Sequence, residues 1–450
     1  MDKWAGGVKP AHPVLRLVNL VGIAMTTQSP CYNVRLVATL ALSMGVMSFD
    51  QASIGYLLPF MKPDLHLTNT QIGVASSTYW VTFAVASYGA GILADKPSSV
   101  RTYLIAVLCA FGVCSLFSAF VSSVDTLFLA RAVMGVLAGA LLTLGQSLLG
   151  LASPPEKVGT NMGLVTGMGS SLSALVIAPV VLVQIADAVG WRFGYVAIAL
   201  PAWLAGVLVF RNILEPEKPN PQPLAVGNKA RLLLTGVAEL IRYRNILLCV
   251  LLCSLTVAYI SLGFTFLPIY FVNVRHFSPA EMSSLIVVLG LSSILFAITL
   301  PAISDRFGRK VVLLTVCATS VLTPLAACYY DGPVVGLAAL LFLGWSMSGT
   351  GTFSMGIIPA ETVGGEILSR ALGFVIALGV LLGGLAGPTI AGWSADRWGA
   401  GAPLLVQALC AATASCVAMA LHETAPRKLS SGGNKGRAVS ASAPRPRPGT

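Results

Sequence analysis

The sequence predicts an all-α polytopic membrane protein with twelve transmembrane helices in two pseudo-symmetric six-helix bundles. Of its 450 residues, 56% are hydrophobic and only 10% are charged, against about 25% in an ordinary soluble domain. Apolar runs of about 20 residues recur along the chain, and landmarks of the first half return in the second. So few polar residues cannot cover a soluble protein of this size, which excludes a soluble enzyme, a nucleic-acid binder and a disordered chain.

The predicted spans are helices because backbone polar groups must be satisfied within the segment when lipid surrounds it. The limits expected from the apolar runs are 36–60, 72–94, 103–121, 127–150, 160–184, 190–211, 245–272, 281–303, 311–329, 334–358, 370–393 and 401–421.

The remaining segments complete the domain organisation. Residues 1–35 are expected to be a cytoplasmic N-terminal segment, followed by a first six-helix bundle at 36–211. Residues 212–244 combine a Pro-rich stretch with a predicted amphipathic helix, and they form a cytoplasmic linker. A second bundle follows at 245–421, and a disordered basic cytoplasmic tail at 422–450.

The positive charges predict the orientation in the membrane. Of 28 Lys and Arg residues, 23 lie on the side shared by both termini, four lie in the opposite loops, and Arg131 lies inside a span. Because cytoplasmic loops carry the excess of Lys and Arg, both termini are expected to be cytoplasmic in a multi-pass protein of the cell (inner) membrane. The net charge of +11 is then an orientation signal and does not indicate nucleic-acid binding.

The two halves repeat one another. Asp95 and Asp305 end the second and eighth predicted spans and are 210 residues apart, as are Gly163 and Gly373 at the start of the fifth and eleventh. Such a repeat is typical of transporters whose halves are related by an axis along the membrane normal. Two bundles that flank a central cavity can rock, and they thereby open it to one side and then to the other.

Glycines in the fifth and eleventh spans predict close helix packing. The eleventh span carries Gly379, Gly383, Gly384 and Gly387, and the fifth is similarly rich in glycine. Their equivalent positions in the two halves favour an interface at which the halves slide, and static packing is the alternative interpretation.

Several short motifs resemble those of the major facilitator superfamily over about residues 36–421. The run Asp305-Arg306-Phe307-Gly308-Arg309-Lys310 resembles the family's cytoplasmic loop motif, whose first-half copy keeps Gly91 and Asp95 but loses the following basic run. Further similarities lie at Arg131–Gly135 and Gly190–Phe193. Ala395-Asp396-Arg397-Trp398-Gly399 is a weaker echo of the loop motif.

The first span resembles the organic anion:cation symporter branch of this family. The run Asp50-Gln51 with Ile54-Gly55-Tyr56 and Pro59 carries that similarity. Two departures stand out: Gln51 replaces an arginine common in the branch, and Ala138 replaces a carboxylate used for coupling in some members.

Two charged residues lie well inside predicted spans, Asp50 and Arg131, and burying either costs roughly 3 kcal/mol on insertion scales. We expect them to face a cavity and to pair. Asp50 is predicted to be the proton-coupling residue. Burial favours its protonated form and a nearby arginine favours its charged form, so that it can bind a proton reversibly. Arg131 is predicted to bind a substrate carboxylate. A static ion pair that fixes the helices is the alternative.

Polar and aromatic residues of the central spans are candidates for substrate binding with Arg131, although most in-span aromatics serve only packing. They are Gln51, Tyr79, Trp80, Gln146, Tyr259, Thr265, Trp345 and Ser348. A gating role is implied by the family motif for a second set, in which Glu361 is a candidate partner of the loop cations. This set comprises Asp95, Asp305, Arg306, Arg309, Lys310 and Glu361.

Together these patterns predict a secondary active transporter that works by alternating access, and not an enzyme. The expected activity is proton-coupled symport of a small organic anion such as an aromatic or sugar acid. Drug/proton antiport is the main alternative, and a membrane enzyme or a channel is less favoured. No catalytic residue, cofactor or metal site is expected, because the four His and nine Cys do not cluster as ligands and a phosphate-binding GxxxxGK[ST] loop is missing. Sodium is an alternative coupling ion, and a monomer is the family expectation.

Overall fold

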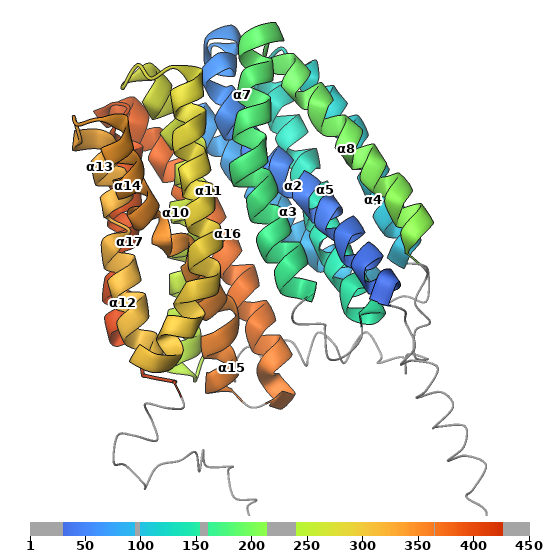
Figure 1. Cartoon of the computed structure of the whole chain (residues 1–450), viewed down its shortest axis with the longest axis vertical. Helices are drawn as coiled ribbons and strands as arrows, with labels where there is room; N and C mark the ends of the chain where they lie inside the picture. Colours follow the sequence, from blue (N-terminus) through green and yellow to red (C-terminus); the bar gives the residue numbers. More distant parts are fainter. Residues whose placement is uncertain (1–29, 95–99, 154–160, 214–239, 364, 426–450) are drawn as a thin grey trace, which may run out of the picture.

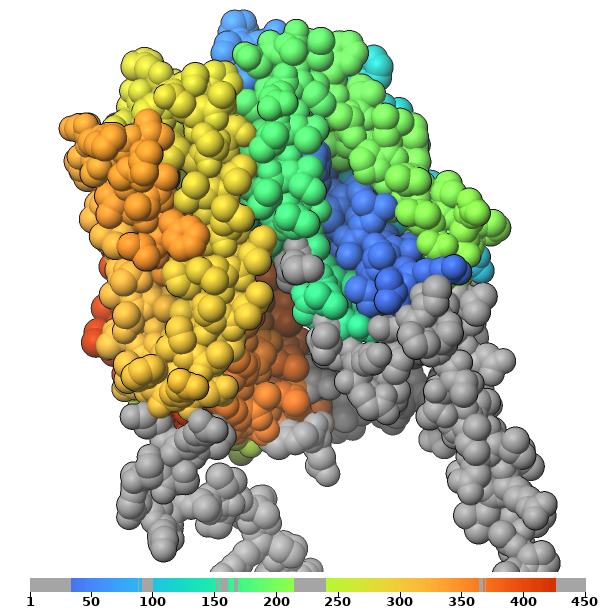
Figure 2. Space-filling view, viewed as in Figure 1, coloured from blue at the N-terminus to red at the C-terminus, as the bar shows by residue number. Residues whose placement is uncertain are grey.

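The computed structural model describes residues 30–94, 100–153, 161–213, 240–363 and 365–425, which fold into two helical halves side by side (Figure 1, Figure 2). The predicted linker helix, most of the N-terminal segment and most of the basic tail lie outside these ranges. The fold class is the predicted one, twelve spans in two six-helix bundles, and the described residues contain helices but no strand.

The helices of the first half begin with α2, whose 36 residues exceed the predicted first span at both ends. The fifth span is irregular, with two π-helical segments before α7. The elements are α2 (Pro30–Leu65), α3 (Asn69–Ala94), α4 (Val100–Ala119), α5 (Val124–Ala152), η2 (Gly163–Gly169), η3 (Leu172–Ile177), α7 (Ala178–Val189) and α8 (Trp191–Asn212).

The second half repeats this order, but two of its spans are broken where the sequence predicts continuous helices. The ninth divides into α12 and α13 around Ser320, and the tenth passes through a 3-10 turn and a π-helical turn. The elements are α10 (Arg244–Asn273), α11 (Pro279–Phe307), α12 (Arg309–Thr319), α13 (Leu322–Tyr329), α14 (Val334–Gly344), η4 (Trp345–Thr350), η5 (Phe353–Ile357), α15 (Ile358–Thr362), α16 (Gly365–Trp398) and α17 (Ala402–Ala420).

Eleven helices in the described ranges are long and apolar enough to cross a membrane. The second predicted span, α3, is not among them, although its 26 residues would suffice for a crossing. Its sequence NTQIGVASSTYW is rich in hydroxyl and amide side chains. This composition fits its place between the two halves, where α3 packs against both α5 and α16.

Two ends of the molecule are distinguished below. The linker end is the one at which α8 finishes at Asn212 and α10 begins at Arg244. The distal end is the opposite one, where α2 meets α3 and α10 meets α11 (Figure 1).

The distal halves of α3 and α16 form a close seam between the two bundles. A β-carbon added at Gly392 would meet the backbone of Asn69, and one added at Gly73 would meet the carbonyl of Pro388. The Ser77 hydroxyl lies 2.7 Å from the hydroxyl of Thr389 across this seam.

The glycine prediction is only partly right. Gly379, Gly383 and Gly387 pack against α10 of their own half, at Cys253, Ser254 and Ala258. They therefore allow static packing, because the α16 face that meets the other half is turned away from them. Gly384, one position further round the helix, does face the other half and lies against Trp80.

Candidate functional site

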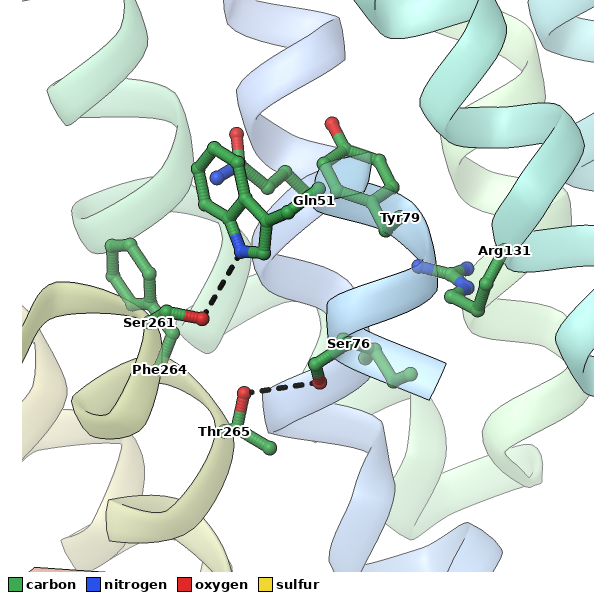
Figure 3. A pocket seen from close by; sticks show the side chains of 9 residues that line it. Gln51, Ser76, Tyr79, Arg131, Ser261, Phe264 and Thr265 are labelled. Atoms are coloured by element: carbon green, nitrogen blue, oxygen red, sulfur yellow. Dashed lines mark hydrogen bonds between the residues drawn. The ribbon is translucent and has the colours of Figure 1, made fainter. Parts of the chain in front are cut away.

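A small cavity lies between the halves at the level of Gln51 and Trp80 (Figure 3). It offers about 20 Å³ to the centres of water molecules, enough for about one water. Pockets that bury small organic ligands measure about 300–1,000 Å³, so the structure has this cavity nearly closed. Its walls are formed by Gln51, Ile54, Ser76, Tyr79, Trp80, Arg131, Ser261, Phe264 and Thr265.

Both bundles supply these walls. Arg131 of α5 and Tyr79 of α3 lie on one side, and Ser261 and Phe264 of α10 lie on the other (Figure 3). The helices come close because α2 carries Gly55 at its crossing with α10. A β-carbon at that position would overlap the carbonyl oxygen of Phe264.

Two hydrogen bonds span the cavity from α3 to α10 (Figure 3). The Trp80 indole Nε1 donates to the Ser261 hydroxyl at 3.0 Å. One turn nearer the distal end, the hydroxyls of Ser76 and Thr265 lie 3.3 Å apart. Opening this cavity to a larger molecule therefore requires that these contacts between the halves separate.

Asp50 and Arg131 form the only buried ion pair in the described ranges. Asp50 Oδ2 lies 4.0 Å from Arg131 Nη1, and both side chains are almost fully enclosed, at 0% and 1% exposure. Arg131 also donates to the Tyr195 hydroxyl at 3.4 Å and lies over the Tyr195 ring, 5.7 Å from its centroid. The pairing predicted from the sequence is present, but at a distance too long for a charge-assisted hydrogen bond.

Several polar atoms of this pair and of the nearby Tyr79 have no hydrogen-bond partner among the described residues. Both carboxylate oxygens of Asp50, the hydroxyl of Tyr79 and the Nε of Arg131 are buried and make no hydrogen bond in the described structure. Buried polar groups are hydrogen-bonded in the large majority of cases, and each exception calls for an explanation. Because Tyr79 and Arg131 also line the cavity, a molecule or water bound in it can supply partners for these two side chains.

Five of the predicted binding residues line this cavity: Gln51, Tyr79, Trp80, Arg131 and Thr265. The sequence reasoning missed Ile54, Ser76, Ser261 and Phe264. Helical spacing carried a signal for the two serines, since residues four apart share a helix face. Ser76 precedes Trp80 by four positions, and Ser261 precedes Thr265 by four.

Tyr259 and Trp345 do not line the cavity and instead belong to the interior of the second half. The Tyr259 hydroxyl lies 2.9 Å from the carbonyl oxygen of Ser320 and 3.2 Å from that of Gly344. Those carbonyls lie at the breaks of the ninth and tenth spans. Pro324, four residues after Ser320, has no N–H to donate to the Ser320 carbonyl. Trp345 packs beside Tyr259, with ring centroids 5.3 Å apart, and donates to Ser293.

Gln146 and Ser348 also lie away from the cavity wall. Gln146 is exposed near the linker end of α5. The Ser348 hydroxyl donates to the carbonyl of Trp345 in its own helical segment, at 2.9 Å. A polar residue within a span can satisfy itself locally in this way, so its presence alone does not identify a binding site.

The predicted gating residue Arg309 makes its ion pairs within the second half of the molecule. Arg309 pairs with Asp305 at 2.7 Å and with Glu361 at 3.0 Å. Sequence reasoning missed Glu423, whose carboxylate accepts from the Arg309 backbone N–H at 2.9 Å and so caps α12. Arg306 is exposed and Lys310 is half-buried, whereas Asp95 lies outside the described residues.

Within the described residues, no group of three or more His, Cys, Asp or Glu side chains is arranged to hold a metal ion. The polar chemistry of the cavity therefore comes from one arginine, one nearby carboxylate and a set of hydroxyl, amide and indole groups.

Known proteins share both the sequence pattern and the fold of this chain. The probable 4-methylmuconolactone transporter of Cupriavidus pinatubonensis is 25% identical over 75% of this chain and 78% of its own length. The hexuronate transporter of Bacillus subtilis is 25% identical over 60% of this chain and 67% of its own. The tetracenomycin C resistance and export protein of Streptomyces glaucescens is 27% identical over 44% of this chain and 37% of its own.

A solved structure, that of a D-xylose-proton symporter, superposes with a TM-score of 0.72 at 16% identity, covering 88% of this chain and 99% of the symporter. Among family sequence profiles, that of the Major Facilitator Superfamily matches residues 40–366 and 276–447. Together with the two helical bundles and the cavity between them, this match shows that the chain is an integral membrane transporter of the Major Facilitator Superfamily.

Proposed function

We propose that the protein is a secondary active transporter that carries a small organic anion together with a proton by alternating access. The observation that carries this proposal is the buried guanidinium of Arg131 on the cavity wall, whose carboxylate partner is 4.0 Å away. A planar guanidinium that is desolvated and incompletely paired favours a carboxylate, which it can bind through two parallel hydrogen bonds.

Asp50 is the proposed proton site. In the absence of substrate, the negative charge of Asp50 partly balances the positive charge of Arg131, 4.0 Å away. A substrate carboxylate bound to Arg131 takes over this role and places a second negative charge nearby, which favours protonation of Asp50. Neither carboxylate oxygen of Asp50 accepts a hydrogen bond in the described structure that protonation would break. One proton would thus accompany each anion.

The substrate's remaining part would meet the other cavity walls. Trp80 and Phe264 offer aromatic surfaces, and Gln51, Ser76, Ser261 and Thr265 offer amide and hydroxyl groups. This mixture suits a compact acid that has an apolar or hydroxylated body. The names of the relatives support this class, because one is a hexuronate transporter and another a probable 4-methylmuconolactone transporter.

Drug/proton antiport is the second candidate. It is favoured by the similarity to the tetracenomycin C resistance and export protein and by Ala138, which stands where some anion symporters carry a second coupling carboxylate. A buried, incompletely paired arginine argues against cationic drugs, since it would repel them from the cavity.

The proposed orientation has the linker end in the cytoplasm. The distribution of Lys and Arg, 23 against four, supports it. The distal end would then face the exterior of the cell membrane.

A thermal-shift screen of the purified full chain tests the substrate class. The panel comprises benzoate, glucuronate and succinate, with the organic cations ethidium and tetraphenylphosphonium as controls. We expect at least one carboxylate to raise the melting temperature in wild type and not in Arg131→Gln. Stabilisation by the cations alone would contradict the anion proposal and favour antiport.

A further inference from the structure

Asp396, at the distal end of α16, makes four hydrogen bonds to the other half of the molecule. Its Oδ1 accepts from the backbone N–H of Asn69 at 3.0 Å and from the Asn69 side-chain amide at 2.8 Å. Its Oδ2 accepts from the backbone N–H of Thr70 at 2.7 Å and from the Thr70 hydroxyl at 2.5 Å. A single carboxylate of the second bundle thereby uses both of its oxygens on the first.

These contacts complete the amino-terminal cap of α3. The first N–H groups of a helix have no partner within the helix, and α3 has a local cap in which Thr68 and Gln71 bond reciprocally. That cap satisfies the N–H of Gln71 but leaves those of Asn69 and Thr70. Asp396 accepts from both, and its negative charge also interacts favourably with the positive end of the helix dipole.

The distal seam continues from this cap to the cavity. Next to Asp396, Gly392 lies against Asn69, and about two turns further on the Ser77 hydroxyl donates to the carbonyl of Leu385 at 2.9 Å. The seam reaches the cavity wall at Trp80, which packs on Gly384. Asp396 is thus the outermost member of a continuous contact that closes the cavity on its distal side.

Polar contacts at the linker end have a different character. Arg309 pairs with Glu361 of its own half at 3.0 Å, and the Asn212 amide donates to Thr39 of its own half at 3.1 Å. These two contacts of the described linker-end residues each brace a single bundle, whereas those of Asp396 join the two bundles.

We infer that Asp396 is the latch of a distal gate, and that release of its carboxylate from α3 is required for the cavity to open at the distal end. The latch holds the distal-closed arrangement by capping a helix of the opposite bundle. When the bundles separate distally, Asn69 and Thr70 lose an acceptor that only the other half provides. This inference concerns the equilibrium between the two arrangements and does not depend on the identity of the substrate.

Hydrogen–deuterium exchange of the full chain in lipid nanodiscs, without substrate, tests the latch. In Asp396→Asn, one carboxylate oxygen is replaced by an amide nitrogen that cannot accept a hydrogen bond from α3, and Asp396→Ala removes all four contacts. We expect peptides on both sides of the seam, in the distal parts of α3 and α16, to exchange roughly tenfold faster in Asp396→Ala, with a smaller increase in Asp396→Asn. Peptides at the linker end should become more protected, because that end closes as the distal end opens.

Asp331→Asn is the matched control, because Asp331 is an exposed carboxylate of the second half that pairs with Arg275 of the same half at 3.4 Å. It should leave the exchange of the seam unchanged. Faster exchange confined to the first turn of α3, with no change at α16 or at the linker end, would show a local cap only and would overturn the latch. An equal effect of Asp331→Asn would also overturn it. Because no substrate is used, failure of the anion proposal would leave this result unaffected.

Discussion

Asp50 and Arg131 come from different helices, α2 and α5, and their charged atoms lie 4.0 Å apart in a fully buried environment. Close charged pairs are usually 2.7–2.9 Å apart. A loose pair beside a cavity fits the proposal that Arg131 exchanges Asp50 for a substrate carboxylate.

Asp50→Asn tests the coupling role. Asn cannot gain or lose a proton, so proton-driven uptake into proteoliposomes should fall to the background level. Exchange of labelled for unlabelled substrate across the membrane should continue, because exchange needs no net proton movement. Asp64→Asn is the matched control, since Asp64 is a distal carboxylate that pairs with Arg192 of its own half at 2.6 Å. Intact driven uptake in Asp50→Asn would exclude Asp50 as the coupling site.

Arg131→Lys tests whether the guanidinium geometry matters as well as the charge. Lysine is a point charge without the planar fork that grips two carboxylate oxygens, so the affinity for the anion should fall about tenfold or more. Affinity is read from the concentration dependence of the thermal shift. Arg275→Lys is the control, at a distal arginine that pairs with the exposed Asp331, and it should bind the anion as wild type does. Unchanged affinity in Arg131→Lys would contradict a bidentate contact between Arg131 and the substrate carboxylate.

Gly384→Ala tests the contact that connects the seam to the cavity. The added β-carbon would lie 2.5 Å from Cβ of Trp80, which forces the indole away from its bond to Ser261. We expect the apparent KM for uptake to rise several-fold. Gly373→Ala lies on the same helix with open space around it and should behave as wild type. Equal KM values for the two variants would show that the seating of Trp80 has no part in binding.

Tyr259→Phe separates structural from binding roles among the in-span aromatics. The change leaves two buried carbonyls, those of Ser320 and Gly344, without their shared donor. This should destabilise the protein by about 1–3 kcal/mol, measured as a lower melting temperature, with the KM unchanged. Tyr329→Phe, at a side chain that is 68% exposed, should alter neither. A raised KM at an unchanged melting temperature would show that Tyr259 takes part in substrate binding.

Hydropathy and the internal repeat were sufficient to predict the twelve spans, because the requirement for apolar helices in lipid acts on each segment independently. The breaks in the ninth and tenth spans were not predictable in this way. Pro324 is a local signal for the first break, because it has no N–H for the Ser320 carbonyl four residues earlier. The donor at both breaks is the Tyr259 hydroxyl, 61 and 85 residues away along the chain, and such long-range compensation leaves no local pattern in the sequence.

The same limit explains the outcome for the site. Trp80 and Trp345 are both tryptophans within apolar spans, but one lines the cavity and the other donates to Ser293 inside its own bundle. The sequence indicates that each is buried and does not indicate in which direction the helix face points. Arg131 was predictable because a charge within a span needs a cavity or a partner wherever the helix is placed.

Proton uptake on substrate binding tests the central claim most directly. Isothermal titration of the full chain with the most stabilising carboxylate of the panel is repeated at one pH in buffers of different ionisation enthalpy. The dependence of the heat on the buffer gives the number of protons bound. The account predicts about one proton taken up per carboxylate in wild type and none in Asp50→Asn. No uptake in wild type, or the same uptake in both proteins, would contradict it.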